Sequence, residues 1–320
     1  MPVAQDRSPV RGPAPLKERL LAWWSGDDVA MPARRPSPAR PPAARKPAAP
    51  AAAPARETLV EPLAPWENPA MRIEQLAWGE GCSKPGGSDY FLELSRPLGL
   101  DATKSILEFG TGLGGGARAL RHNTGVWIEG YELEPELARA ARQLAIRGRM
   151  EKGVDIACYS PQDFAPRPGG YDCILSRETL YRIENKEDLL VKFEQALKPR
   201  GHLMITDFVL TPGTSAKDPK LKAFGSGPLA FWPTEHYVRH FRERNFDLRI
   251  NEDITATYRK LVLEGCKRFS EGEPRLVGHA KAYPSETVTF LDQWAKRVMA
   301  FDAGLLKVMR FSALKSGNIK

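Results

Sequence analysis

Apolar positions along the chain change spacing in a regular way after about residue 104. Short apolar runs, typical of buried strands, alternate with segments whose apolar residues recur every three or four positions, which is typical of helices. The expected strands are residues 105–109, 126–132, 154–158, 171–176 and 202–208, and the expected helices are residues 114–122, 134–147 and 186–197. This alternation predicts βαβ crossovers and a parallel sheet covered by helices on both faces.

The pattern becomes less regular after this core. Residues 211–228 are rich in Gly, Lys and Pro, and they precede an expected helix, 234–245, and an expected strand, 246–252. Further helices are expected over 256–268 and 286–303, with a last strand over 305–314. We therefore expect an α/β domain over residues 105–320. Its sheet is doubly wound, mostly parallel and seven-stranded, with a lid or insert at 209–232 and a helical insert at 254–303.

The chain before this domain has a different composition. Residues 31–56 are mostly Pro, Ala and Arg, with almost nothing to bury, so residues 1–56 are expected to form a disordered basic tail. Within the tail, Leu16–Trp24 has the spacing of a short amphipathic helix. This helix either docks on a protein partner or a membrane surface, or packs on its own domain. Residues 57–104 are expected to form a helical segment in front of the core.

Charge and cysteine content narrow the possible partners and location. The net charge is +8, but six of these charges lie in residues 1–56, so the remainder is nearly balanced and no specific nucleic-acid surface is expected. The four cysteines are far apart and form no CxxC pair, which favours reduced thiols. No apolar run approaches the roughly 20 residues of a membrane span, and no secretory signal is apparent. A cytoplasmic location is expected.

A glycine-rich turn follows the first expected strand, in Ile106–Gly116. A strand that runs through such a turn into a helix lets the backbone approach a nucleotide closely. Glu132, at the end of the second strand, can accept both hydroxyls of a ribose. Because Gly110, Gly112 and Gly115 also fit GxGxxG, a nicotinamide-dependent oxidoreductase is an alternative at this point.

Further blocks follow in a fixed order. Glu108 stands two residues before the first glycine, Ser160–Phe164 follows the third strand, and Leu197–Asp207 contains LKPRG. Together these blocks resemble the class I S-adenosylmethionine-dependent methyltransferases, which have a Rossmann-like fold. The resemblance implies S-adenosylmethionine as cofactor, with Glu108 facing its ammonium group, Asp163 its adenine amino group and Phe164 its ring. The expected cofactor-binding residues are Glu108, Gly110, Thr111, Gly112, Gly114, Glu132, Leu133, Gln162, Asp163, Phe164, Ser176 and Arg177.

A narrower resemblance concerns the acceptor. Trp78–Gly87, Gly114–Gly116 and Ser176–Glu178 are similar to segments of phosphoethanolamine and small-amine N-methyltransferases, in which the segment before the core helps to cover the cofactor. Their active-site tyrosine and histidine are replaced here by Asn68 and Arg182, and their phosphate clamp has no clear counterpart. The phosphobase substrate is therefore not carried over, and the acceptor is expected to be an unidentified small or lipid-related molecule.

Glu178 and Tyr181, which follow the fourth strand, are the candidates for positioning or deprotonating that acceptor. His236 and His240 share a helix face but lack an identifiable third ligand, so no metal is expected. Because the tyrosine and histidine of the phosphobase enzymes are missing, a regulatory or scaffolding protein that binds S-adenosylmethionine without methyl transfer is the alternative to an enzyme.

Overall fold

The computed structural model describes residues 63–160, 163–225, 227–244 and 246–317. The predicted tail and its helix at residues 16–24 lie outside these residues, as does Gln162.

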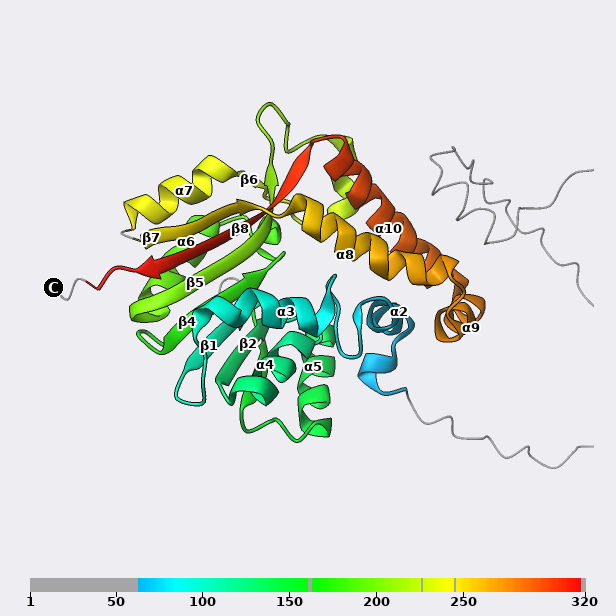
Figure 1. The fold of residues 1–320 in the computed structure, drawn as a ribbon, viewed down its shortest axis with the longest axis horizontal. Coiled ribbons are helices and arrows are strands. Elements are labelled where there is room, and N and C mark those ends of the chain that lie inside the picture. Colours follow the sequence, from blue (N-terminus) through cyan, green and yellow to red (C-terminus); the bar gives the residue numbers. More distant parts are fainter. Residues whose placement is uncertain (1–62, 161–162, 226, 245, 318–320) are drawn as a thin grey trace, which may run out of the picture. The chain divides into compact units, whose positions relative to one another are not determined.

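The core is a mixed sheet with the strand order β3-β2-β1-β4-β5-β8-β7 (Figure 1). Strands β1 to β5 run parallel to one another, whereas β8 is antiparallel to both of its neighbours, β5 and β7. The two-residue β6 adds an eighth strand beside β5. The predicted doubly wound, mostly parallel sheet is confirmed. The strands are β1 (Ser105–Phe109), β2 (Trp127–Glu132), β3 (Val154–Cys158), β4 (Tyr171–Arg177), β5 (Leu197–Leu210), β6 (Trp232–Pro233), β7 (Phe246–Asp253) and β8 (Leu306–Lys315).

Helices cover both faces of this sheet, because successive strand residues point to opposite faces. Ile106 belongs to the apolar cluster beneath α3 (Gly87–Ser95), α4 (Gly115–Thr124) and α5 (Pro135–Arg147). The next residue, Leu107, belongs to the cluster beneath α6 (Lys186–Ala196) and α7 (Thr234–Glu243). Buried aliphatic residues at both positions therefore fix the strand between two helical layers.

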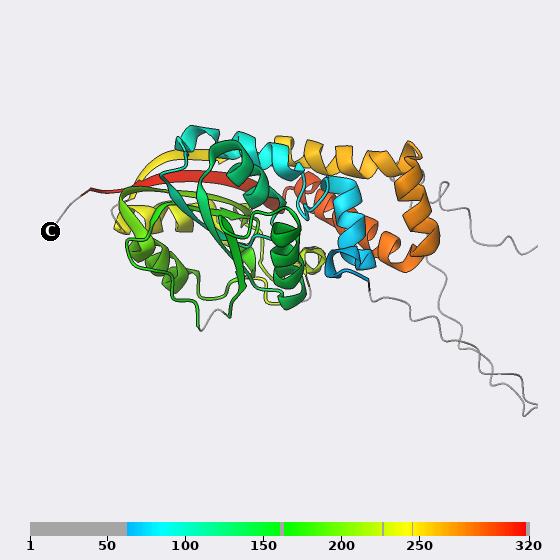
Figure 2. The ribbon, with the colours of Figure 1, turned by 90° about the horizontal axis from the view of Figure 1, so that it is seen from below.

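A group of four helices stands beyond the carboxyl ends of β4 and β5 (Figures 1 and 2). Its core is aromatic: the ring of Trp78 packs edge-on against Trp294, with centroids 5.1 Å apart. Gly265 leaves room for the same ring, since a Cβ atom there would lie 2.0 Å from it. The helices are α2 (Pro69–Trp78), α8 (Thr255–Ser270), α9 (Pro274–Ala282) and α10 (Pro284–Asp302).

Two local predictions differ from the structure. Residues 274–282 form α9, which the sequence pattern did not predict because the helix is short and carries Gly278 inside it. Strand β5 begins at Leu197 rather than at residue 202, because Leu197 already pairs with Tyr171 before a register shift. Within this extension Arg200 has a φ of +62°, in the left-handed region.

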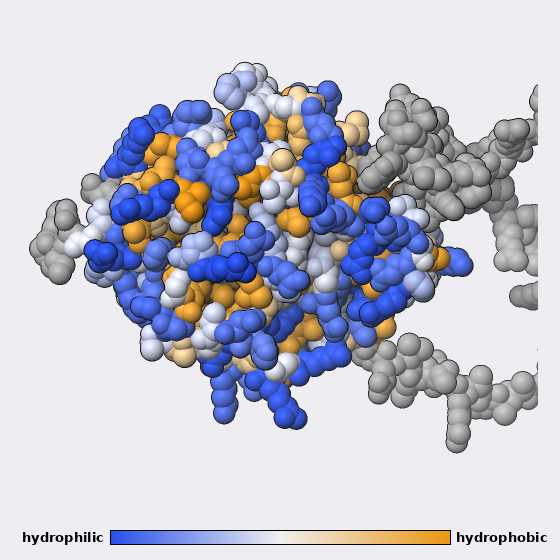
Figure 3. Space-filling model, viewed as in Figure 1, coloured by the Kyte–Doolittle hydropathy of each residue, from blue (hydrophilic) through white to orange (hydrophobic). Residues whose placement is uncertain are grey.

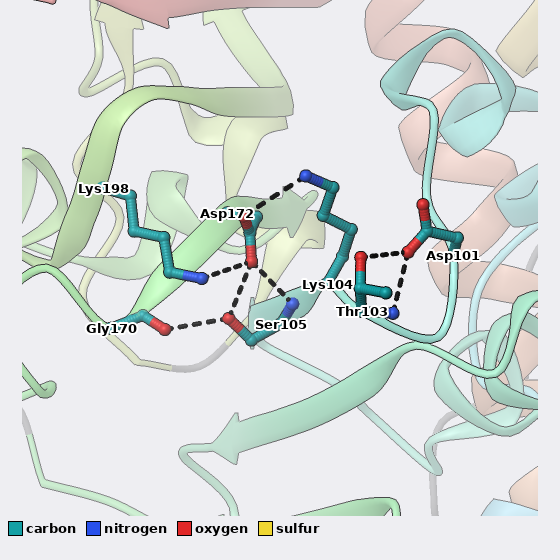
Figure 4. A network of polar contacts seen from close by, with 7 residues as sticks. All are labelled: Asp101, Thr103, Lys104, Ser105, Gly170, Asp172 and Lys198. Atoms are coloured by element: carbon teal, nitrogen blue, oxygen red, sulfur yellow. Dashed lines mark hydrogen bonds and ion pairs between the residues drawn. The ribbon is translucent and has the colours of Figure 1, made fainter.

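The amino ends of three strands are joined by one carboxylate (Figure 4). Asp172, near the start of β4, accepts hydrogen bonds from the backbone N–H of Ser105 at 2.9 Å and from Lys198 Nζ at 2.7 Å. Lys104 Nζ lies 3.7 Å from its other oxygen. This network holds the strands together at their amino ends, which lie opposite to the helical group.

Hydrophilic and hydrophobic residues are interspersed on the face shown in Figure 3. Among the described residues, no helix combines the length and the apolar character needed to cross a membrane.

Candidate functional site

The chain makes a tight turn between β1 and α4. Gly110, Gly112 and Gly114 have φ angles of +81°, +57° and +72°, which favour glycine, and Gly114 is the residue before the first turn of α4. A Cβ atom would lie 2.0 Å from Thr179 Oγ1 at Gly110, and 2.1 Å from Ser83 Oγ at Gly112. Glycine is therefore required both for the backbone conformation and for the close approach of two neighbouring segments.

Glu132, the last residue of β2, is bound to this turn. Its Oε2 accepts a 2.7 Å hydrogen bond from the backbone N–H of Gly112, and its Oε1 accepts a 3.1 Å bond from that of Glu134. The residue is only 5% exposed. Each carboxylate oxygen retains a lone pair for a further donor. Its place at the carboxyl edge of a parallel sheet is the usual ligand position in open α/β folds.

Glu108 provides a second buried acid, inside β1. It is 6% exposed, and its Oε2 has no hydrogen-bond partner within the described part of the chain. Burial raises its pKa to about 7, although Lys84 and Arg177 favour the charged form. Together with Thr111 and Ser83 it lines a small cavity of about 20 Å³. Buried acceptors are nearly always satisfied, so this oxygen is suited to a donor group of a ligand.

Lys84, which sequence reasoning missed, joins three segments at this edge. Its Nζ donates to the carbonyl oxygens of Gly110, at 2.6 Å, and of Arg177, and to Thr179 Oγ1 at 3.3 Å. Burial lowers its pKa. The residue lies in the predicted segment Trp78–Gly87, but nothing in the sequence indicates that its side chain reaches the glycine turn.

Two predicted cofactor-binding residues at the end of β4 form hydrogen bonds with other parts of the protein. Ser176 is fully buried and its Oγ donates a 3.1 Å hydrogen bond to the carbonyl of Phe109, which links β4 to β1. Arg177 donates to the carbonyl of Pro85 at 3.0 Å and packs over the ring of Tyr90 at 5.3 Å. Arg177 also lines the small cavity beside Glu108. Only Arg177 of this pair is therefore next to a cavity.

Glu178 has an unusual backbone for a residue with a side chain. Its φ is +42°, and its N–H donates to the carbonyl of Thr206 at 2.7 Å. Its Oε1 accepts a 2.5 Å bond from Thr206 Oγ1, and its Oε2 lies 3.6 Å from Arg177 Nη2. Left-handed non-glycine residues occur preferentially at functional sites, where the surrounding structure holds them.

Tyr181 lies in an aromatic environment. Its ring stacks on Phe231 with centroids 5.6 Å apart, and its hydroxyl donates a 3.1 Å hydrogen bond to the carbonyl of Phe224. Burial raises the pKa of this phenol. The hydroxyl is thus bound to a backbone carbonyl, and the ring is left to form apolar contacts.

A cavity of about 490 Å³ borders Leu133, the residue after Glu132; it is lined by three aromatic rings and by charged residues such as Arg182 and Asp188, and we call it the aromatic cavity. It includes the predicted residues Leu133 and Phe164, and also Phe109 and Tyr159, which were not predicted. The ring of Phe164 packs edge-on against Phe109, with centroids 5.1 Å apart. Asp163 is exposed, and its carboxylate accepts a 2.6 Å hydrogen bond from Ser160 Oγ.

A second cavity, of about 170 Å³, lies over the glycine turn. Leu133 and Arg182 line both cavities, so the two are neighbours. The walls of the second cavity combine carboxyl groups, cations and aromatic rings. They include the predicted residues Gly110, Gly112, Glu132, Leu133, Glu178 and Tyr181, and the unpredicted residues Glu74, Lys84, Phe208, Tyr258, Trp294 and Arg297.

The two histidines of α7 are placed among side chains. His240 Nε2 accepts a 3.0 Å hydrogen bond from Arg244 Nε, and the ring of His236 lies 5.7 Å from that of Trp232. Within the described ranges, no group of three or more His, Cys, Asp or Glu residues is arranged to hold a metal ion.

Residues 87–249, about half of the chain, match the family described as methyltransferase domain, and the chain belongs to this family. The class I methyltransferase fold anticipated from the motifs is thereby confirmed. Individual relatives add detail but cover the chain only in part.

Phosphoethanolamine N-methyltransferase 1 of Triticum aestivum is 27% identical over 192 residues, which make up 60% of this chain and 34% of the relative. The chain thus spans about a third of that relative's length. Phosphoethanolamine N-methyltransferase 2 of Haemonchus contortus, solved with S-adenosyl-L-methionine, has a TM-score of 0.70 at 19% identity, and the match covers 78% of this chain and 58% of that chain. A geranyl diphosphate C-methyltransferase from Streptomyces coelicolor A3(2) has a TM-score of 0.56 at 16% identity, covering 71% and 76%. At these identities the structures establish the fold.

Proposed function

We propose that the protein is an S-adenosylmethionine-dependent methyltransferase that acts on a small or lipid-related acceptor. One observation carries this function: the polar cavity, which includes Glu132 and the glycine turn, shares Leu133 and Arg182 with the aromatic cavity. A nucleoside with a polar extension fits such a pair of cavities. Membership of the methyltransferase-domain family supports the same function.

The residues present fit this cofactor. The unpartnered Glu108 Oε2 is suited to the ammonium group, and Glu132 to the ribose hydroxyls. Leu133 and Phe164 form the walls for the adenine ring. The glycine turn itself borders the polar cavity through Gly110 and Gly112. Asp163 and Gln162 stay predictions for the adenine amino group, because Asp163 is engaged with Ser160 and Gln162 lies outside the described residues.

When bound, S-adenosylmethionine supplies a methyl group that is already activated by its sulfonium charge. The chain therefore has mainly to hold an acceptor in line with that carbon, at roughly 3 to 3.5 Å. The small polar cavity is suited to this because it is bounded by the aromatic rings of Tyr181, Phe208 and Trp294. Rings of this kind exclude water without competing for the reacting groups.

Glu178 and Tyr181 are proposed to position the acceptor rather than to take its proton. The carboxylate of Glu178 is held by Thr206, and the hydroxyl of Tyr181 donates to the carbonyl of Phe224. Both side chains line the polar cavity.

A cytoplasmic location stays a prediction from the sequence.

Calorimetric titration of the purified protein with S-adenosylmethionine, S-adenosylhomocysteine and NAD tests the proposal. We expect micromolar binding of the two adenosyl compounds and none of NAD. A screen of small amines, phenols and carboxylic acids with radiolabelled methyl donor then tests transfer. Binding of NAD alone would overturn the assignment. Binding of the adenosyl compounds without transfer to any acceptor would instead favour a regulatory role.

A further inference from the structure

The polar cavity contains three carboxyl groups, and two of them accept hydrogen bonds from the protein. Glu132 accepts hydrogen bonds from two backbone N–H groups, and Glu178 accepts one from Thr206. The third is Glu74, from α2, to which the described residues donate no hydrogen bond. Glu178 Oε2 also lacks a hydrogen bond, but it lies 3.6 Å from Arg177 Nη2, so the charge of that carboxyl is already paired. Within the described residues, Glu74 is the carboxyl of this cavity that has neither a hydrogen bond nor an ion pair, while the Tyr181 hydroxyl is engaged with Phe224.

Glu74 lies on the wall contributed by the helical group. The helices α2, α8 and α10 contribute Glu74, Tyr258 and Trp294, whereas the sheet edge contributes Gly110 and Gly112. A cofactor held by Gly110, Gly112 and Glu132 would border the space between these two walls. An acceptor in that space is covered by the helices and has Glu74 at its border.

The electrostatic surroundings make this carboxyl responsive to charge. Burial raises the pKa of Glu74 to about 8, and Glu132 contributes in the same direction, while Arg297 and Lys84 oppose it. An additional positive charge nearby favours the ionised form of a carboxyl group and lowers its pKa. The titratable and charged groups that share the cavity with Glu74 are Lys84 from the segment before α3, Glu132 from β2, Glu178 after β4, Tyr181 and Arg182 from η3 (Leu180–Arg182), Tyr258 from α8 and Arg297 from α10. On its other side α2 packs on α9, where His279 lies beside Pro69 and Arg72.

Building on the proposed function, we propose that Glu74 is the proton acceptor of the reaction, ionised by the positive charge of the bound methyl donor. The lone pair of the acceptor atom forms the new bond to the methyl carbon, and the electron pair of the broken sulfur–carbon bond stays on sulfur. The proton of the acceptor atom passes to the Glu74 carboxylate. The positive charge of the bound methyl donor thus favours the ionised Glu74 carboxylate. The proton taken from the acceptor neutralises this carboxylate in the same step that removes the positive charge.

The test measures protons rather than turnover. Calorimetric titrations of the full chain at pH 7.5, in buffers of different ionisation enthalpy, give the number of protons released on binding. We expect S-adenosylmethionine to release more protons than S-adenosylhomocysteine, which has the same amino group but no sulfonium charge. In Glu74→Gln this difference should be lost, and in the exposed Glu67→Gln it should be unchanged. Thermal unfolding verifies that both variants fold.

The outcomes separate this inference from the proposed function. If the wild type binds neither adenosyl compound, the proposed function fails. If it binds both and Glu74→Gln keeps the full difference in proton release, the role of Glu74 is overturned. With any acceptor found in the screen, Glu74→Gln should lower kcat by about 10²-fold or more with little change in cofactor affinity. An unchanged kcat would also overturn the inference.

Discussion

The backbone N–H of Gly112 donates a 2.7 Å hydrogen bond to the carboxylate of Glu132, which joins the glycine turn after β1 to the carboxyl end of β2. The two features from which the cofactor was inferred are therefore one unit in space, although 20 residues separate them. The bond also fixes the orientation of the carboxylate, because a second backbone N–H, from Glu134, binds its other oxygen.

Replacing Glu132 with Ala should weaken the binding of S-adenosylmethionine by about 10²-fold. The variant loses hydrogen bonds to the ribose from a charged group, each worth about 1.5–3 kcal/mol, and also the anchor of the glycine turn. Calorimetric titration measures the dissociation constant. Glu136→Ala, at an exposed position of α5, is the matched control and should bind as the wild type does. An unchanged dissociation constant in Glu132→Ala would remove this residue from the site.

Gly112→Ala should abolish measurable cofactor binding in a folded protein. The new methyl group would lie 2.1 Å from Ser83 Oγ, at a φ of +57° that residues with a Cβ atom rarely adopt. Gly278→Ala is the control, because a Cβ atom at that position of α9 meets nothing within 4 Å. Calorimetry and thermal unfolding are compared for both variants. Wild-type affinity in Gly112→Ala would show that the ligand does not approach this turn.

Cofactor affinity should depend on pH through Glu108. Burial raises the pKa of its carboxyl to about 7, so the group is neutral below that pH and charged above it. Because the charged form attracts an ammonium group, affinity should fall as the pH decreases from 7.5 to 5.5, approaching a tenfold loss per pH unit below the pKa. Titrations of Glu108→Gln across this range should show weaker binding and a smaller slope. An identical slope in that variant would assign the pH dependence to another group.

The sequence predicts the sheet well because buried parallel strands need apolar residues on both faces, as at Ile106 and Leu107. It also predicts the glycine turn and Glu132, whose roles depend on local backbone geometry. It does not predict Lys84 or Glu74, which reach the site from outside the core motifs. Their participation depends on how α2 and the following segment pack over the sheet edge, and no short sequence pattern encodes that packing.

Arg200→Gly should stabilise the fold by roughly 0.5–1 kcal/mol. Arg200 has a φ of +62°, which costs a residue with a Cβ atom about 1–2 kcal/mol, and the greater freedom of glycine in the unfolded chain offsets part of the gain. The melting temperature should rise by roughly 1–4 °C. Arg249→Gly, an exposed substitution within β7, should lower it instead. A decrease in Arg200→Gly as well would mean that the Arg200 side chain contributes more than its backbone costs.

The last prediction concerns the buried pair Tyr237 and Asp207. The Tyr237 hydroxyl donates a 2.8 Å bond to Asp207 Oδ2, while the backbone N–H of Tyr181 binds Oδ1 at 3.2 Å. Tyr237→Phe should lower the free energy of unfolding by about 1–3 kcal/mol, because a fully buried acceptor loses its partner. Tyr283→Phe, at a partly exposed position, should have little effect.

The size of this loss should depend on pH. Burial raises the pKa of Asp207 to about 7, well above the 3.8 of an unperturbed aspartate. The protonated form therefore contributes stability that is complete at low pH and is lost as the pH rises through about 7. The Tyr237 hydroxyl stabilises the charged form, and its removal therefore raises the pKa of Asp207 further. Tyr237→Phe should consequently cost more at pH 8 than at pH 5, as urea unfolding at both pH values can measure. An equal cost at both values would mean that Asp207 does not change its protonation state in the folded protein between them.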